Sequence, residues 1–277
     1  MPLPRGATPS PRNLLASATP YRPLMGALGA IPDTFGVVPA TLTMLGNGTY
    51  GDCVSAEEGE AKNAYSTYYG SGTPLVPTDS EVIAFARKHG ILNGAVISDV
   101  LDLMASAGMT IGSQTYKDGP KLSVDWTSDA TLRAAIYQGP VKIGVASSQL
   151  EDAMNAADGI AYGFSHDGNL DHCVALQGYG GMGPLCALHG VPLPSSIPAT
   201  TPGYFLYTWG RVLIIDRQSM LNITGEAWLR TPTTVGHVPD PPGPTPPGPT
   251  PSDSISYFDH SNKVFFMPDD WTRAPNP

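Results

Sequence analysis

The sequence predicts an α+β fold for residues 31–231, and three observations lead to this prediction. Amphipathic helical patterns fill the first part of this region, and short strand patterns fill the second part. Helices and strands that are segregated in this way favour an antiparallel sheet with helices beside it over alternating βαβ units. Proline-rich segments flank the region, whose length is typical of one domain with a sizeable core.

The first predicted helix begins at Cys53, directly after a glycine-rich turn at residues 46–52. Val54, Ala61 and Tyr65 recur at spacings of seven and four residues, which places them on one face of a helix. The opposite face carries charged side chains, and we expect its glutamates to face solvent: Glu57, Glu58 and Glu60.

Three further helices are predicted from their end signals. The segment Thr78-Asp79-Ser80-Glu81 matches a capping box, and Gly90 ends the helix that follows it. A third helix runs from Ser98 to Gly108. A fourth runs from Ser128 to Gln138 and ends at Gly139-Pro140, because proline disfavours continuation of a helix.

Beyond Pro140 the hydrophobic period changes to that of strands. Val141, Ile143 and Val145 alternate with Lys142 and Gly144, which predicts a strand with one buried face. Three more apolar runs follow between Gly- and Pro-rich turns: Cys173–Leu176, Tyr204–Tyr207 and Val212–Ile215.

The flanking segments divide the chain into four parts. Residues 1–30 form a proline-rich N-terminal arm, and residues 31–231 form the domain. Residues 232–251 read as an extended spacer, since Pro-Pro-Gly-Pro-Thr occurs twice in succession there. Residues 252–277 are apolar and aromatic enough to be a docking peptide, so the arms predict a homo-oligomer or a larger protein assembly.

Composition excludes several classes of function. The net charge is −9 and the basic residues are scattered, which argues against nucleic-acid binding. No apolar run is long enough to span a membrane, and the N-terminus lacks the pattern of a secretory signal. We therefore expect a cytoplasmic or virion-associated protein. Three cysteines at irregular spacing predict neither a disulfide scaffold nor a metal site, and we expect no cofactor.

Cys53 and His172 are the residues whose positions suggest chemistry. The N-terminus of a helix stabilises a thiolate through its free N–H groups and its dipole, and Cys53 lies at such a position. A free cysteine is, however, equally well explained as a small buried hydrophobe. A nucleophilic thiol needs a base, and among the six histidines only His172 stands at the start of an apolar strand.

Four blocks in this chain resemble papain-like cysteine peptidases. Residues 171–180 are similar to the D-H-A-V-x-x-V-G-Y-G block that carries the catalytic histidine of that family, and residues 47–54 are similar to its Q-G-x-C-G-S-C-W. Residues 138–146 resemble its G-P-V-S-V-A-I strand, and residues 159–162 its G-I-Y turn. The resemblance implies a papain-like fold, in which an N-terminal helical half with the nucleophile helix packs on a C-terminal antiparallel sheet or barrel half.

The resemblance also implies roles for four residues. Cys53 takes the place of the nucleophile, His172 that of the general base, and Asn47 that of the oxyanion-hole glutamine. The third catalytic position departs from the family pattern, because residues 204–210 are two residues shorter and contain no asparagine. Thr208 is our preferred orienting residue, since its hydroxyl could bond the imidazole, and Tyr207 and Trp209 remain alternatives.

Three functional hypotheses follow. The first is a papain-like peptidase or amide hydrolase that uses a Cys-His dyad on a peptide or protein substrate. The second is a papain-like module with weak or lost chemistry that serves as a structural or binding part of a larger assembly, because the oxyanion and third positions are altered. A third is another Cys-His class, such as a bacteriocin-leader peptidase, a cell-wall endopeptidase or a transglutaminase.

Overall fold

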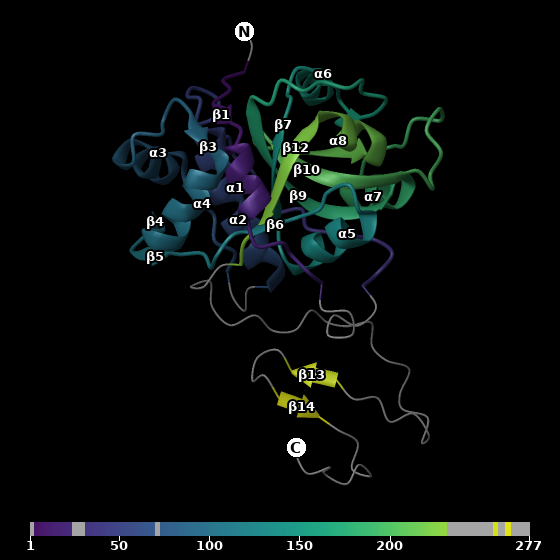
Figure 1. The fold of residues 1–277 in the computed structure, drawn as a ribbon. Helices are drawn as coiled ribbons and strands as arrows, with labels where there is room; N and C mark the ends of the chain where they lie inside the picture. The colour runs from purple at the N-terminus through teal and green to yellow at the C-terminus, as the bar shows by residue number, and fades with distance from the viewer. Residues whose placement is uncertain (1–2, 24–30, 70–72, 232–256, 260–263, 267–277) are drawn as a thin grey trace.

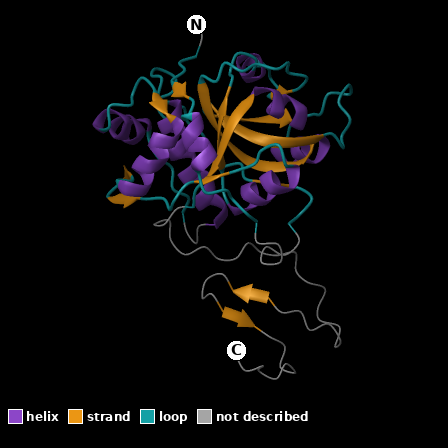
Figure 2. Ribbon diagram, in the orientation of Figure 1, coloured by secondary structure: helices purple, strands orange, loops and turns teal. Residues whose placement is uncertain are grey.

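The computed structural model describes residues 3–23, 31–69, 73–231, 257–259 and 264–266 (Figure 1). Most helices of the first half gather on one side and the large sheet lies on the other, as Figure 2 shows. The predicted α+β class is confirmed. The predicted spacer at residues 232–251 lies outside the described residues. Of the predicted docking peptide, only β13 (Tyr257–Asp259) and β14 (Val264–Phe266) are described, and their backbones pair antiparallel.

The helical half contains the three helices predicted for it, together with α1 (Arg12–Ser17), which the sequence patterns do not predict. The three predicted helices are α2 (Cys53–Tyr69), α3 (Asp79–Lys88) and α4 (Ile97–Ser106). Thr78 and Glu81 form the expected capping box at the start of α3. Short strands complete this half: β1 (Ala7–Thr8), β3 (Ala95–Val96), β4 (Met109–Ile111) and β5 (Gln114–Tyr116).

The second half is built on one sheet with the strand order β6-β12-β7-β9-β10-β11-β8, and β2 (Phe35–Gly36) adds to β9. All of its neighbouring strands pair antiparallel except β11 and β8. The strands are β6 (Leu122–Ser123), β7 (Val141–Val145), β8 (Ile160–Ala161), β9 (His172–Gly181), β10 (Pro202–Thr208), β11 (Arg211–Asp216) and β12 (Thr224–Leu229).

Four helices accompany this sheet. They are α5 (Asp129–Gln138), α6 (Leu150–Asn155), α7 (Met182–His189) and α8 (Arg217–Ile223). Helix α5 matches the predicted fourth helix, with Ser128 as its N-cap. The sequence patterns do not predict α6, α7 or α8, because α6 and α8 span fewer than two full turns and α7 starts in a segment rich in glycine and proline.

The expectation that the glutamates of α2 face solvent is wrong. Glu57, Glu58 and Glu60 are all buried, because α2 packs against β9 with one face and against α3 and α4 with others. The expectation of one buried face for β7 is also wrong, since all five of its residues are buried. Lys142 faces α2, where it binds Glu57 and Glu58, and the alternating apolar residues of β7 lie in a core cluster.

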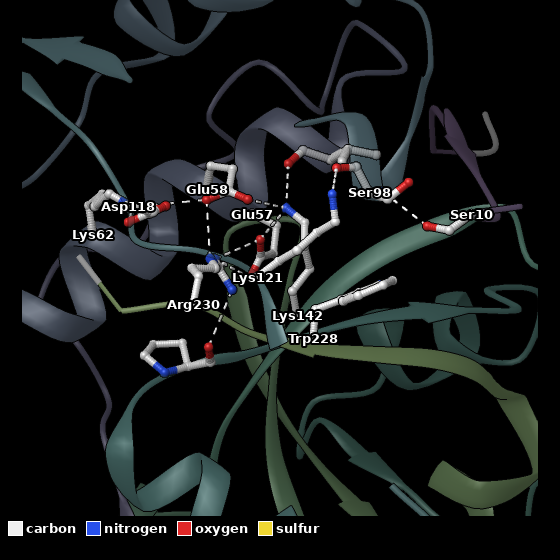
Figure 3. A network of polar contacts seen from close by, with 12 residues as sticks. Ser10, Glu57, Glu58, Lys62, Ser98, Asp118, Lys121, Lys142, Trp228 and Arg230 are labelled. Atoms are coloured by element: carbon white, nitrogen blue, oxygen red, sulfur yellow. Dashed lines mark hydrogen bonds and ion pairs between the residues drawn. The ribbon is translucent and has the colours of Figure 1, made fainter. Parts of the chain in front are cut away.

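Helix α2 is joined to the sheet by a network of buried charges, shown in Figure 3. Lys142 on β7 forms ion pairs with Glu57 at 2.6 Å and with Glu58 at 2.7 Å. Arg230, just after β12, binds the same two glutamates at 2.8 and 3.2 Å. On the far side, Lys62 pairs with Asp118 at 2.7 Å.

The network is balanced in charge, with three cations and three carboxylates. Burial opposes ionisation of Glu58, but the charges of Arg230, Lys142 and Lys62 outweigh it and lower the pKa of Glu58 to about 2. Glu60 lies outside the network, and burial raises its pKa well above the usual value. Buried ions are tolerated when each has partners, whereas loss of one partner leaves an uncompensated charge in the core.

Residues 3–23, which the sequence assigns to an arm, contact the domain along their length. Strand β1 pairs in parallel with β3. The Ser10 amide donates to Glu226, and the Ser10 hydroxyl accepts from the amide of Ser98 at the start of α4. Tyr21 is buried and its amide donates to the Ser123 carbonyl. The boundary at residue 31 stays a prediction.

Replacement of Lys142 by methionine should destabilise the protein strongly. The change leaves Glu57 and Glu58 without one of their cations, and we expect the free energy of unfolding in urea to fall by about 3–5 kcal/mol. Lys88→Met, at an exposed position at the end of α3, should change it by less than about 0.5 kcal/mol. Equal urea midpoints for the two variants would contradict the assigned role of the network.

Candidate active site

Cys53 is the first residue of α2 and its side chain is 1% exposed. The chain enters the helix through a turn in which Gly46 has φ of +93°, and the Asp52 carbonyl accepts the amides of Ser55 and Ala56. The glycine is required there, because a side chain at Gly46 would meet the Asp52 carboxylate. The sequence-predicted position of the thiol at a helix N-terminus is therefore confirmed.

His172 is the first residue of β9, opposite Val145 on β7, and is also 1% exposed. Its Nε2 atom lies 2.7 Å from the hydroxyl oxygen of Thr208, and its Nδ1 atom has no hydrogen-bond partner in the described part of the chain. If the proton sits on Nε2, Nδ1 keeps its lone pair and can act as a base.

Thr208 is thus the residue of the three alternatives that bonds the imidazole. Tyr207 points elsewhere, since its hydroxyl donates to the Thr43 carbonyl at 2.6 Å. Trp209 stacks on the His172 ring, with ring centres 4.0 Å apart and planes 14° from parallel. Trp209 and Gly210 have φ of +43° and +71°, the pattern of a type I′ hairpin turn between β10 and β11.

The backbone brings Cys53 next to the histidine strand. The amide of Cys173, the residue after His172, lies close enough to the Cys53 thiol to lower its pKa. Asn47 is buried beside the same turn, but its side-chain NH2 donates to the Tyr50 carbonyl at 3.1 Å. All four predicted site residues are buried. The structure joins His172 to Thr208 by a hydrogen bond, places the Cys53 thiol against the backbone next to His172, and engages the Asn47 donor in its own turn.

Burial favours the uncharged forms of both Cys53 and His172. Burial raises the pKa of the Cys53 thiol to about 11, although the amides of Cys173 and Gly6 oppose it. Burial, with a smaller contribution from the Arg5 charge, lowers the pKa of His172 to about 3. Asp52 is buried as well, and burial raises its pKa to about 7. At neutral pH this geometry holds a thiol and a neutral imidazole.

The N-terminal segment, residues 4–8, covers the site. The Gly6 amide approaches the Cys53 thiol, and the Gly6 carbonyl accepts the Ala95 amide at 2.8 Å. On the other wall, the Ala7 amide donates to the Asp171 carbonyl at 3.1 Å. The segment thus lies extended between the start of β3 and the start of β9, hydrogen-bonded to both.

The fit of this segment depends on glycine. A Cβ atom on Gly6 would lie 1.7 Å from the carbonyl oxygen of Gly51, and a Cβ atom on Gly51 would lie 2.6 Å from that of Arg5. The two backbones therefore touch at Gly51, two residues before Cys53. Sequence reasoning missed this contact, because Gly6 sits among prolines and no local pattern marks it as part of the site.

The other two cysteines, Cys173 and Cys186, form no disulfide. All three cysteines are free and buried, and Cys186 lies on α7. Within the described ranges, His, Cys, Asp and Glu side chains form no cluster that could hold a metal ion.

Each helix in those ranges is too short or too polar to cross a lipid bilayer.

Comparison with solved structures identifies the fold. Xylellain, a cysteine protease from Xylella fastidiosa, is 13% identical, with a TM-score of 0.58 over 83% of this chain and 96% of that chain. A structure concerning the mite allergens Blo t 1 and Der p 1 is 15% identical, with a TM-score of 0.57 over 79% and 77% of the two chains. The Carica candamarcensis cysteine protease CMS1MS2 in complex with E-64 is 17% identical, with a TM-score of 0.52 over 73% and 99%.

The chain has the papain-like fold of these cysteine proteases, in a divergent form. The expected resemblance is confirmed at the level of the fold. No protein-family model and no curated protein sequence matches the chain.

Gly6→Ala should open the site. The added methyl group overlaps the Gly51 carbonyl, so the segment at residues 4–8 has to leave, and burial no longer raises the pKa of the Cys53 thiol to the same extent. We expect iodoacetamide to modify Cys53 about tenfold faster or more at pH 8, measured by peptide mass spectrometry. Gly168→Ala is the control, since its Cβ would meet nothing nearer than 4.0 Å. Unchanged labelling in Gly6→Ala would contradict the assigned cover.

Proposed function

We propose that this protein is a thiol-dependent hydrolase of peptide or related amide bonds, with Cys53 as the nucleophile and His172 as the base. The observation that carries the proposal is the hydrogen bond between Nε2 of His172 and Thr208, which leaves Nδ1 unpartnered beside a strand that contacts the Cys53 thiol. The fold of the compared cysteine proteases supports the same assignment.

The reaction proceeds in two halves. Nδ1 of His172 takes the thiol proton while the sulfur of Cys53 attacks the substrate carbonyl carbon, and the Cys53 amide stabilises the resulting oxyanion. The imidazolium then gives its proton to the leaving amine, and a thioester remains. Water, deprotonated by the same imidazole, hydrolyses the thioester and restores the thiol. Asn47 can add a second oxyanion donor once its NH2 group leaves the Tyr50 carbonyl.

The closed geometry makes this enzyme latent. A buried thiol with a pKa near 11 and a buried imidazole with a pKa near 3 do not exchange a proton at neutral pH. Departure of the N-terminal segment admits water, which favours both the thiolate and the imidazolium, and removes the Arg5 charge, which favours the imidazolium. Activity therefore requires displacement of residues 4–8.

Selective reactivity of Cys53 tests the proposal without knowledge of a substrate. In the Gly6→Ala protein we expect iodoacetamide to modify Cys53 faster than Cys173 or Cys186, and His172→Ala to slow the reaction at Cys53 alone by about tenfold or more, because the thiolate loses its counter-charge. Rates are followed by mass spectrometry of the three cysteine peptides. Equal and slow reaction of all three thiols would overturn the hydrolase proposal.

Thr208→Val should separate orientation of the base from substrate binding. Valine keeps the shape of threonine and removes the hydroxyl that bonds Nε2. We expect kcat for a peptide substrate, measured in the Gly6→Ala background, to fall by about 10- to 100-fold with little change in KM, since orientation matters in the transition state. Thr208→Ser retains the hydroxyl and is the matched control. An unchanged kcat in Thr208→Val would remove Thr208 from the site.

The second candidate is a papain-like module with weak or absent chemistry in a larger assembly. Two observations favour it: both pKa shifts oppose the ion pair, and the Asn47 donor is engaged by its own turn. Oligomerisation through the terminal segments belongs to this candidate. Removal of residues 232–277 should then lower the oligomeric state measured by light scattering, and a monomeric intact chain would count against it.

A further inference from the structure

We propose that Glu151 and Asp171 form a subsite that selects a basic side chain in peptides bound at the Cys53–His172 site, and that residues 4–8 are an internal ligand of this subsite. The inference rests on the proposed function in one respect only, namely that peptides occupy this site. It adds a substrate class, extended peptides with arginine or lysine next to a glycine.

The two carboxylates hold Arg5 from different elements. Glu151, in the first turn of α6, binds one guanidinium nitrogen at 2.8 Å, and Asp171, directly before His172, binds another at 2.8 Å. This forked arrangement suits guanidinium, which presents several donors in one plane. The three side chains are 20–32% exposed, so the subsite opens to solvent and a ligand from outside can reach it.

Asp171 is fixed in place independently of Arg5. Its second carboxylate oxygen accepts the amide and the hydroxyl of Ser147, at 3.0 and 2.9 Å. In the described part of the chain, neither Asp171 nor Glu151 forms an ion pair with any other cation. When Arg5 leaves, two neighbouring carboxylates remain without a counter-charge, and a basic side chain of a substrate would supply it.

Residues 4–8 contact the protein as an extended peptide ligand would. Backbone hydrogen bonds anchor Gly6 and Ala7 to the two walls, and they impose no choice of side chain. Gly6 fills the point where the backbone touches Gly51 beside Cys53, so only glycine fits there. Arg5 is the one side chain of residues 4–8 that forms ion pairs, and the subsite that binds it is therefore the part of this contact that distinguishes one peptide from another.

The preference of the Glu151–Asp171 subsite for a basic side chain can be tested in the full-length protein. The rate at which iodoacetamide labels Cys53 measures how often residues 4–8 leave the site. We expect Arg5→Lys to label nearly as slowly as the wild type, Arg5→Ala about threefold faster, and Arg5→Glu about tenfold faster or more, because exposed pairs contribute modestly and like charges repel. In the Arg5→Glu protein, Glu151→Arg should slow labelling again. The control is Asp152→Arg in the same protein. Asp152 is an exposed neighbour on α6, and its replacement should leave the labelling rate unchanged.

A peptide added from outside tests the substrate class. The probe is a fluorescent peptide of residues 3–8, Leu-Pro-Arg-Gly-Ala-Thr, with norleucine and glutamate in place of its arginine as comparisons. Binding to the full-length protein with Arg5→Glu and Cys53→Ser is followed by anisotropy, so no cleavage occurs. We expect the arginine peptide to bind about tenfold tighter than the glutamate peptide, and Glu151→Gln to weaken it about two- to fivefold while Asp152→Asn does not.

The outcomes separate this inference from the proposed hydrolase. Arginine-selective binding with an unreactive Cys53 would retain the subsite and overturn the hydrolase. Equal binding of the arginine and norleucine peptides, no binding of any peptide, or equal rescue by Glu151→Arg and Asp152→Arg would overturn the subsite.

Discussion

The buried ion pairs between α2 and the sheet are the interaction on which the site depends. Lys142 binds the carboxylates of Glu57 and Glu58 and also the carbonyl of Val54, the residue after Cys53. Three residues further along the same strand, Val145 lies opposite His172. Lys142 therefore attaches the start of α2 to β7, and β7 in turn pairs with the start of β9 at His172. A shift of α2 along the sheet would separate these buried charges from their partners, and an uncompensated charge in the core is strongly destabilising.

The contact between the N-terminal segment and the site favours the uncharged forms of Cys53 and His172. It excludes water from Cys53 and His172, and exclusion of water disfavours every charged form of both residues. It also places the guanidinium of Arg5 near the imidazole, which disfavours imidazolium further. The backbone contact at Gly6 and Gly51 and the ion pairs of Arg5 act at neighbouring points, so the segment closes the site as one unit.

The hairpin turn after Thr208 shows how the site tolerates local strain. A bulky residue with positive φ is uncommon, and Trp209 adopts φ of +43°. Its indole ring covers the His172 imidazole, and its N–H group points to the Pro4 carbonyl at 3.4 Å. The turn therefore links His172, its hydrogen-bond partner Thr208 and the N-terminal segment.

The sequence by itself determined the order of the elements and where most of the predicted helices begin, because capping residues, glycine stops and hydrophobic periods act over a few positions. It also named Cys53, His172, Asn47 and Thr208 as candidate site residues, all of which are buried in the structure. Only the tertiary structure decided that Glu57 and Glu58 are buried, since their partners Lys142 and Arg230 lie 84 to 173 residues away. Only the tertiary structure also shows the contacts of Arg5 and Gly6, because their partners lie on α6, on β3 and directly before β9. A charged side chain in a helical pattern faces solvent unless a distant partner offsets its burial, and no local pattern in the sequence reports that partner.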